Sequence, residues 1–205
     1  MNGTAARRAR VLLRRELRAA LAERELWIFG YGSLMWDPGF RHVETAPALL
    51  HGWHRRFCVY SHRYRGTADC PGLVLGLDRG GHCWGMAYRV ARRDAKAVLH
   101  YLWDRELDGG VYRMKRVRLR LKARAVRAYA FTVNRGHQGY AGLLTPEQTA
   151  QFIHQGNGAR GPCRSYLENT VRHLTRLGLA DRTLHRLIEI VVRAGASDSN
   201  GVCSP

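Results

Sequence analysis

The sequence predicts an α+β fold, with strands in the first two thirds of the chain and helices in the last third. Three observations lead to this class. Apolar runs of strand length, separated by glycine-rich turns, recur between residues 27 and 133. One stripe at helical spacing interrupts them between Arg92 and Glu106. Three helical patterns with their own start signals follow residue 144.

Length and composition suit one folded domain. The chain has 205 residues, of which 45% are hydrophobic, enough for a sizeable core. No apolar run reaches the roughly 20 residues of a membrane span, and the start of the chain lacks the apolar segment of a secretion signal. We therefore expect a soluble, cytoplasmic protein with one domain over 26–195, a basic helical extension over 1–25 and a flexible tail over 196–205.

The extension is predicted as an arginine-rich amphipathic helix over residues 4–24, outside the core of the fold. Its apolar side carries Val11, Leu12, Leu13, Leu17 and Leu21. A mitochondrial transit peptide would have a similar composition, but Glu16, Glu23 and Glu25 argue against one.

The first strand ends in a glycine turn that could hold an anion. An apolar run leads into Gly30 and Gly32, so a buried strand should break into a turn with uncovered backbone N–H groups. Such groups form a concave donor site for a carboxylate or an oxyanion, and the hydroxyls of Tyr31 and Ser33 could complete it. An ordinary strand-to-loop connection would also explain the two glycines.

Two pairs of strands are predicted next. Residues 43–50 and 53–60 mix apolar and basic residues, as on a sheet with one wet face. Residues 73–77 and 83–90 are apolar runs joined by Asp78-Arg79-Gly80-Gly81, which predicts a hairpin at the centre of the sheet.

Residues 111–121 and 125–133 add a further pair, so the sheet should have about six strands or more. Two polar loops, 61–72 and 134–142, are the places where substrate contacts are expected. The second loop would bring Tyr140 near the site if the strand ends gather there.

Glu106 ends the helical stripe. It lies four residues past Leu102 and three past Trp103, so it should face inward on the last turn, before Asp108-Gly109-Gly110 ends the helix. A carboxylate that faces a core is costly unless it is paired or useful. The alternative is that Glu106 turns outward and pairs with a nearby arginine.

The last third carries clear helix signals. Thr145 precedes a proline and forms a capping box with Gln148, and Ser165 begins a second predicted capping box. Gly178 should end the second helix, and Asp181 should cap the third.

The net charge of +18 favours nucleic acid or another anionic surface as a partner. No helix-turn-helix, zinc or RNA-binding aromatic pattern accompanies it, so a nucleic-acid partner is disfavoured but stays as the alternative from another class. Five cysteines at irregular spacings indicate neither a disulfide framework nor a zinc site. Histidines 51 and 54 lack companions at ligand spacing, so we expect no metal.

Several phrases of the chain together resemble one family. They are Phe29-Gly30-Tyr31-Gly32-Ser33-Leu34 with Trp36, Tyr64-Arg65-Gly66-Thr67 with Pro71-Gly72, Cys83-Trp84-Gly85-Met86-Ala87-Tyr88-Arg89, Leu102-Trp103-Asp104-Arg105-Glu106, and Tyr166-Leu167. This collinear set, from about residue 27 to about residue 192, is similar to the ChaC-like γ-glutamylcyclotransferases. The longer spacing from Glu106 to Tyr112 looks like the bacterial-type branch.

The resemblance implies a mostly antiparallel, barrel-like sheet flanked by helices, with no cofactor. It implies that glutathione is the substrate and is degraded to 5-oxoproline and cysteinylglycine, with Glu106 as the catalytic residue. The expected substrate-binding residues are Ile28, Phe29, Gly30, Tyr31, Gly32, Ser33, Leu34, Arg65, Tyr112 and Tyr140. Cys163 stands where relatives carry an asparagine, so a role given to that asparagine does not transfer. The sequence carries no signal for an oligomeric state.

This reaction suits a lone carboxylate. The α-amine of the substrate attacks its own γ-carbonyl, and because its pKa is about 8 or above, a base must first remove a proton. Apolar surroundings would raise the pKa of Glu106 towards the operating pH, whereas Arg105 folded over the carboxylate would lower it. Cyclisation of other γ-glutamyl amides is the alternative within the same fold.

Overall fold

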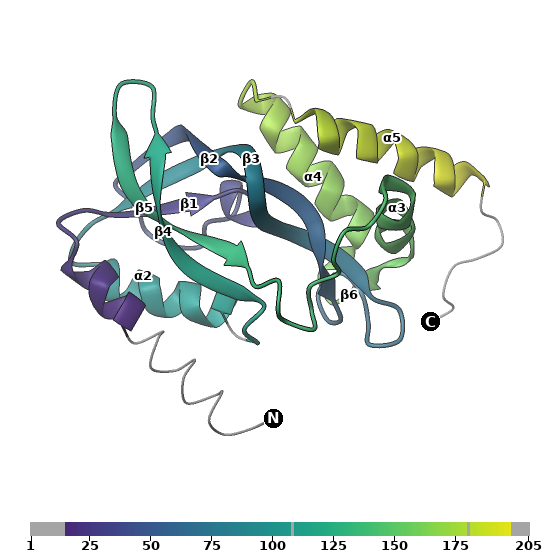
Figure 1. The fold of residues 1–205 in the computed structure, drawn as a ribbon, viewed down its shortest axis with the longest axis horizontal. Coiled ribbons are helices and arrows are strands. Elements are labelled where there is room, and N and C mark those ends of the chain that lie inside the picture. Colours follow the sequence, from purple (N-terminus) through teal and green to yellow (C-terminus); the bar gives the residue numbers. More distant parts are fainter. Residues whose placement is uncertain (1–14, 108, 180, 198–205) are drawn as a thin grey trace.

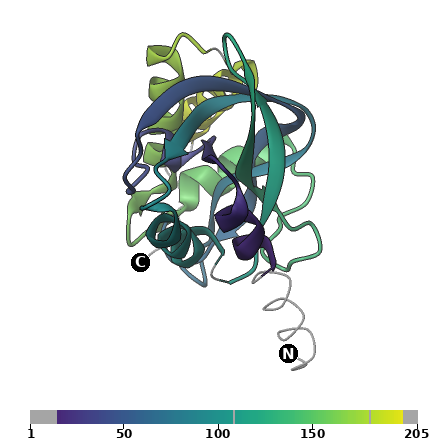
Figure 2. The ribbon, with the colours of Figure 1, turned by 90° about the vertical axis from the view of Figure 1, so that its left-hand side faces the viewer.

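The computed structural model describes residues 15–107, 109–179 and 181–197 and contains a closed barrel of five strands (Figures 1 and 2). The strands are β1 (Leu26–Gly30), β2 (Glu44–Ser61), β3 (Gly72–Val90), β4 (Tyr112–Arg120) and β5 (Ala125–Val133), in the order β1-β3-β2-β4-β5. Neighbours in this order pair antiparallel. The barrel closes where β1 runs parallel to β5, and a further parallel pair joins β3 to β5. The predicted α+β class with a mostly antiparallel barrel is confirmed.

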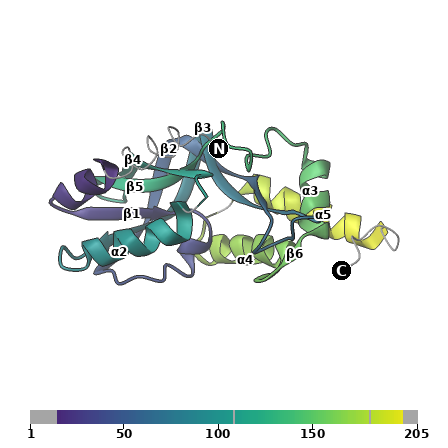
Figure 3. The ribbon, with the colours of Figure 1, turned by 90° about the horizontal axis from the view of Figure 1, so that it is seen from below.

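Helices cover two regions of the barrel. They are α2 (Ala95–Leu102), which continues as a π-helical turn (Trp103–Leu107), α3 (Pro146–Gln155), α4 (Cys163–Arg176) and α5 (Arg182–Ser197). A short hairpin of β6 (Asn157–Gly158) and β7 (Gly161–Pro162) precedes α4. In Figure 3, α2 lies along β1, while α3, α4 and α5 gather at the other end of the molecule. No helix of the described residues is long and apolar enough to cross a membrane.

Two helix starts follow the predicted chemistry and one does not. Thr145 and Gln148 exchange the hydrogen bonds of a capping box at α3, and the Asp181 carboxylate accepts from the Leu184 N–H at the start of α5. Ser165, however, lies inside α4, which begins at Cys163 directly after Pro162. The predicted start was wrong because the N–H of Cys163 is already satisfied by the carbonyl of Gly156.

The predicted hairpin at Asp78–Gly81 is also wrong, because β3 runs through it without turning. β2 is likewise one strand, and the two pair along almost their whole length. Gly80 and Gly81 together oppose Gly52, and all three have φ between 62° and 106°. The glycines therefore form a bulge that bends a long strand pair. As a result, the barrel has five strands, whereas we expected about six or more.

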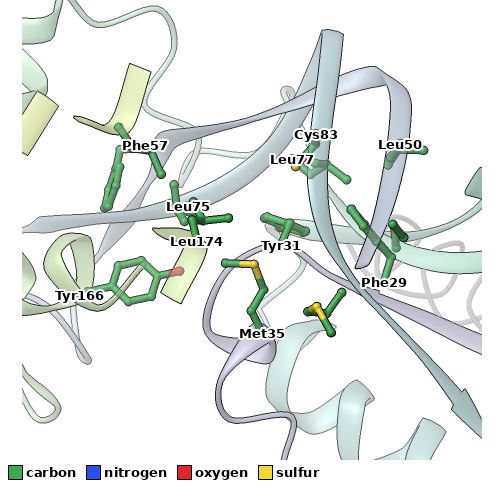
Figure 4. Packing of buried hydrophobic residues seen from close by; sticks show 14 of the residues in the cluster. Phe29, Tyr31, Met35, Leu50, Phe57, Leu75, Leu77, Cys83, Tyr166 and Leu174 are labelled. Atoms are coloured by element: carbon green, nitrogen blue, oxygen red, sulfur yellow. The ribbon is translucent and has the colours of Figure 1, made fainter. Parts of the chain in front are cut away.

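The core has a main cluster and a second one under α2. Figure 4 shows part of the main cluster, with Tyr31 and Met35 between barrel residues such as Phe29 and the α4 residues Tyr166 and Leu174. In the second cluster, Ala20 of the N-terminal helix is 1% exposed and lies with residues of β1 and α2. The part of the extension that the structure describes, helical over residues 15–22, thus precedes the predicted 26–195 domain and packs on its core. Residues 11–13 and 198–205, which carried further predictions, lie outside the described residues.

Candidate active site

The end of β1, the π-helical turn and two loops surround a pocket of about 700 Å³. Its lining includes Ser33, Trp36, Asp37, Tyr64, Arg65, Tyr101, Arg105, Glu106, Tyr112, Arg160 and Tyr166. This volume is in the usual range for a small-molecule site. The chain therefore brings residues from positions 33 to 166 to one cavity.

The glycine turn forms one wall of the pocket. After Gly30 the chain turns through Gly32 into a 3₁₀ turn over Ser33–Met35, in which the Met35 N–H donates to the Gly32 carbonyl at 2.8 Å. Among the described residues, the N–H groups of Gly32 and Ser33 have no acceptor, as expected at the start of such a turn. A Cβ on Gly32 would lie 2.8 Å from the Tyr166 hydroxyl, so the turn approaches the pocket wall as closely as a glycine permits.

The residues around this turn divide between pocket and core. Ser33 lines the pocket, whereas Ile28, Phe29 and Leu34 are buried in the two core clusters. The Tyr31 hydroxyl donates to the Phe131 carbonyl at 2.8 Å. These four buried side chains support the turn from behind, because they lie in the core and not among the residues that line the cavity.

Glu106 lines the pocket from the π-helical turn and also pairs with its neighbour. The Arg105 Nε lies 3.1 Å from the Glu106 Oε1, and the Glu106 side chain is 17% exposed. The inward and the arginine-paired positions, which the sequence analysis left as alternatives, therefore occur together. Burial raises the pKa of Glu106 above its ordinary value, although Arg105 opposes this.

Arg105 connects Glu106 to the glycine turn. Its guanidinium donates to the Ser33 hydroxyl at 3.1 Å, to the Tyr101 hydroxyl at 2.7 Å and to the Asp37 carbonyl at 2.9 Å. Because four groups hold one planar cation, the carboxylate beside it has a fixed position relative to Ser33. Arg105 is thus a positioning residue.

Two tyrosines, Tyr112 and Tyr166, also line the pocket. The Tyr112 hydroxyl donates to the Leu75 carbonyl at 2.7 Å. Burial raises the pKa values of Tyr112 and Tyr166 well above their ordinary value, so both hydroxyls stay protonated at neutral pH.

Arg65 reaches the pocket from the first polar loop. Its guanidinium donates to the carbonyls of Arg160 and Pro162, at 2.6 and 3.1 Å, and lies over the Tyr166 ring. The Cys163 thiol, at the position of the family asparagine, donates to the Leu73 carbonyl at 2.8 Å and is buried.

Tyr140 does not line this pocket, contrary to prediction. Its hydroxyl donates to the Asp78 carboxylate at 3.0 Å and accepts from the Arg56 guanidinium at 2.9 Å. Asp78 is 1% exposed and is also paired with Arg135. Although burial opposes ionisation, these hydrogen bonds hold the pKa of Asp78 below its ordinary value. The second polar loop is therefore anchored to the barrel by a buried carboxylate.

Replacing Tyr140 with phenylalanine should lower the free energy of unfolding by about 1 kcal/mol, because it removes one hydrogen bond to a carboxylate that keeps its arginines. Denaturant titration measures this loss. Steady-state turnover should stay within about twofold of the wild-type value. A large fall in turnover with an unchanged free energy of unfolding would mean that Tyr140 takes part in substrate binding or in the reaction.

Sequence reasoning did not assign Tyr101, Arg160 and Tyr166 to the site. Tyr166 belonged to a family phrase, which was the one available signal. Tyr101 faces the pocket from the helix before Glu106, and Arg160 comes from the turn between β6 and β7, 95 residues after Arg65. Within the described residues, no group of three or more His, Cys, Asp or Glu side chains could hold a metal ion.

The barrel, with a partly buried carboxylate and a glycine turn beside one pocket, has the fold of the γ-glutamylcyclotransferases. A crystal structure of a yeast γ-glutamylcyclotransferase specific to glutathione superposes with a TM-score of 0.80 and covers 87% of this chain and all of its own, at 22% sequence identity. This likeness shows the fold.

Sequence comparison identifies the family within that fold. The model of the ChaC-like proteins matches residues 26–194, so the chain belongs to the ChaC-like family. The glutathione-specific γ-glutamylcyclotransferase of Escherichia coli K12 is 36% identical over 185 residues, which cover 89% of this chain and 80% of the relative. The human glutathione-specific γ-glutamylcyclotransferase 1 is 32% identical over 157 residues, which cover 74% of this chain and 68% of the relative.

Proposed function

We propose that this protein degrades glutathione by cyclising its γ-glutamyl group, which releases 5-oxoproline and cysteinylglycine. The observation that carries this proposal is the partly buried Glu106 carboxylate, held by Arg105 in a pocket that Ser33 of the glycine turn also lines. The named relatives support glutathione as the substrate.

Glu106 acts as the base. Its carboxylate takes a proton from the substrate's α-ammonium, and the freed amine attacks the γ-carbonyl carbon to form the C–N bond of a five-membered ring. The protonated Glu106 gives this proton to the cysteine nitrogen as its bond to the γ-carbon breaks, and the second proton of the ring nitrogen passes to the same carboxylate or to water, which leaves the neutral lactam of 5-oxoproline. A raised pKa suits both steps, since a general acid and base works best when its pKa lies near the operating pH.

The glycine turn supplies hydrogen-bond donors. During attack the γ-carbonyl oxygen gains negative charge, and the N–H groups of Gly32 and Ser33 can donate to it or to the α-carboxylate beside the amine. The protonated hydroxyls of Tyr112 and Tyr166 exclude water and hold the glutamyl chain curled. Such positioning makes an intramolecular attack efficient, with effective molarities that reach about 10⁵ M or more.

The direct test is incubation of the purified protein with glutathione, with 5-oxoproline and cysteinylglycine measured by mass spectrometry. Formation of both in equal amounts supports the proposal. γ-Glutamyl-alanine in a parallel reaction separates a glutathione enzyme from a general cyclotransferase. Absence of 5-oxoproline from every γ-glutamyl compound would contradict the function.

We infer that the protein works in the cytoplasm. The Cys58, Cys83 and Cys163 thiols are free, as expected in a reducing compartment. Fractionation of cells, with a cytoplasmic marker enzyme as the reference, tests this location.

Replacing Arg105 with methionine should move the acidic limb of kcat/KM to higher pH. Turnover needs the Glu106 carboxylate, so activity rises as pH rises through its pKa. In the wild type, Arg105 opposes the upward effect of burial on that pKa, and its removal leaves only the smaller effect of Arg160 against burial. A profile of kcat/KM against pH measures the shift.

The Arg105→Lys variant is the matched control, because it keeps the charge and loses the planar fork. The acidic limb of its kcat/KM profile should lie closer to that of the wild type than the limb of Arg105→Met does. Identical limbs in the three proteins would mean that Arg105 does not set the protonation of Glu106.

A further inference from the structure

The mouth of the pocket is built from two loops fixed to each other. The N–H groups of Ala159 and Arg160 donate to the carbonyls of Arg63 and Tyr64, each at 2.9 Å. Gly158 makes this approach possible, since a Cβ there would lie 2.6 Å from the Gly66 nitrogen. Side chains from both loops therefore have a defined relative position.

This mouth carries cations that have no carboxylate partner among the described residues. The Arg63 and Arg160 guanidiniums lie over the Tyr64 ring, at 5.5 and 4.9 Å from its centroid. Neither forms a salt bridge there, although most other arginines that reach this pocket or the barrel core are paired. Arg65 lies beside them and is already held by two carbonyls.

The pocket therefore carries groups of opposite charge. Glu106 supplies the negative charge, and the arginines of the mouth supply the positive charge. The Arg160 charge is near enough to lower the pKa of the Glu106 carboxyl, in opposition to burial. A ligand with an ammonium at one end and a carboxylate at the other would match both. Glutathione has this pattern, because its α-ammonium belongs to the glutamyl end and its glycine carboxylate to the opposite end.

We propose that Arg63 and Arg160, stacked on Tyr64, bind the C-terminal carboxylate of the peptide that leaves, an inference that rests on the proposed function. Guanidinium groups suit this task, because they bind carboxylates through two parallel hydrogen bonds. The α-carboxylate is only one carbon from the amine, so it lies beside Glu106 and is served by the donors of the glycine turn. The site selects γ-glutamyl peptides that end in a free carboxylate and discriminates against esters and amides at that end.

The experiment compares glutathione with its glycine ethyl ester, which lacks the distal charge and carries an ethyl group in its place. In the wild type, the ester should have a KM about tenfold higher, the lower end of the range for a hydrogen bond to a charged group, because the arginines are exposed. The double variant Arg63→Gln, Arg160→Gln should have a KM for glutathione as high as the KM of the wild type for the ester. Its KM for the ester should not rise further.

Arg93→Gln is the matched control. Arg93 has a side chain that is 77% exposed and does not line the pocket, so its removal lowers the net charge by one without touching the site. This variant should show the same difference in KM between glutathione and the ester as the wild type. Circular dichroism checks that each variant is folded.

If the wild-type enzyme is active, two results would overturn the inference. One is an equal rise in the KM of the double variant with both substrates, and the other is no rise in KM with either. The first would mean that the arginines bind another group or only support the loops. If the wild type released no 5-oxoproline, the proposed function itself would fail. Calorimetric binding of the two compounds, which needs no turnover, would then show whether the mouth still distinguishes acid from ester.

Discussion

Replacing Glu106 with glutamine is expected to lower kcat with glutathione by at least about 10²-fold, the lower end of a general base's contribution. The amide keeps the shape of the side chain and its place beside Arg105, but it cannot accept the proton of the α-ammonium. Because the pocket walls are unchanged, binding should be largely kept. Release of 5-oxoproline under saturating glutathione gives kcat, and calorimetry gives the affinity.

Glu168→Gln is the control for this variant. Glu168 also pairs with a neighbouring arginine, Arg164, but it lies on α4 and does not line the pocket. It should have wild-type turnover. A folded Glu106→Gln protein with near-normal kcat would remove this carboxylate from the mechanism.

The Gly32→Ala variant should lose about 10²-fold in kcat/KM, the cost that a displacement near 1 Å has in a positioned site. The backbone φ of Gly32 is −126°, outside the positive range that favours glycine, so the expected effect is steric. It comes from the added Cβ, which would lie 2.8 Å from the Tyr166 hydroxyl and force the turn or the tyrosine to move. Both kcat and KM should change, because binding and attack use this turn.

Tyr166→Phe tests this cause, because it removes the oxygen that the new methyl group meets. In a double-variant cycle, Gly32→Ala combined with Tyr166→Phe should lose less than the sum of the two single losses. Gly136→Ala, where the nearest atom would be 3.7 Å away, is the benign control. If the losses in kcat/KM of the two single variants were additive, the effect of Gly32→Ala would not come from its contact with Tyr166.

Local pattern predicted those parts of the fold that depend on neighbours in the sequence. The capping box at Thr145, the helix before Glu106 and the turn after Gly30 each follow from residues within a few positions. The predicted hairpin at Asp78–Gly81 failed because a glycine pair makes a turn or a bulge according to what lies opposite. Here Gly52 lies opposite, and strand pairing brings it there.

That error also affected the site. With Asp78 in an exposed turn, nothing would have held Tyr140, and the loop that carries it was expected to face the pocket. In the barrel, Asp78 is a buried carboxylate on a continuous strand, and it binds the tyrosine instead. Arg160 was missed for a similar reason, since its contact with the Arg65 loop joins residues 95 positions apart.

The π-helical turn has a different lesson. The spacing from Leu102 suggested an inward Glu106 on an ordinary helix, and Glu106 does reach the pocket. The π turn rotates its residues relative to that spacing, so Trp103, expected inside, is only partly buried. A count of three or four residues could not anticipate this change of pitch.

The closure of the barrel fixes when, during synthesis, an active site can first exist. β1 carries the glycine turn, yet its partners in the sheet are β3 and β5, and the second of these ends at Val133. The Arg65 loop is fixed later still, by the carbonyls of Arg160 and Pro162. A ribosome that has made the chain only as far as residue 110 has therefore produced Glu106 and the glycine turn, but not β5, the strand that closes the barrel. On the proposed function, a chain that ends before Tyr166 cannot cyclise glutathione, because it lacks part of the pocket.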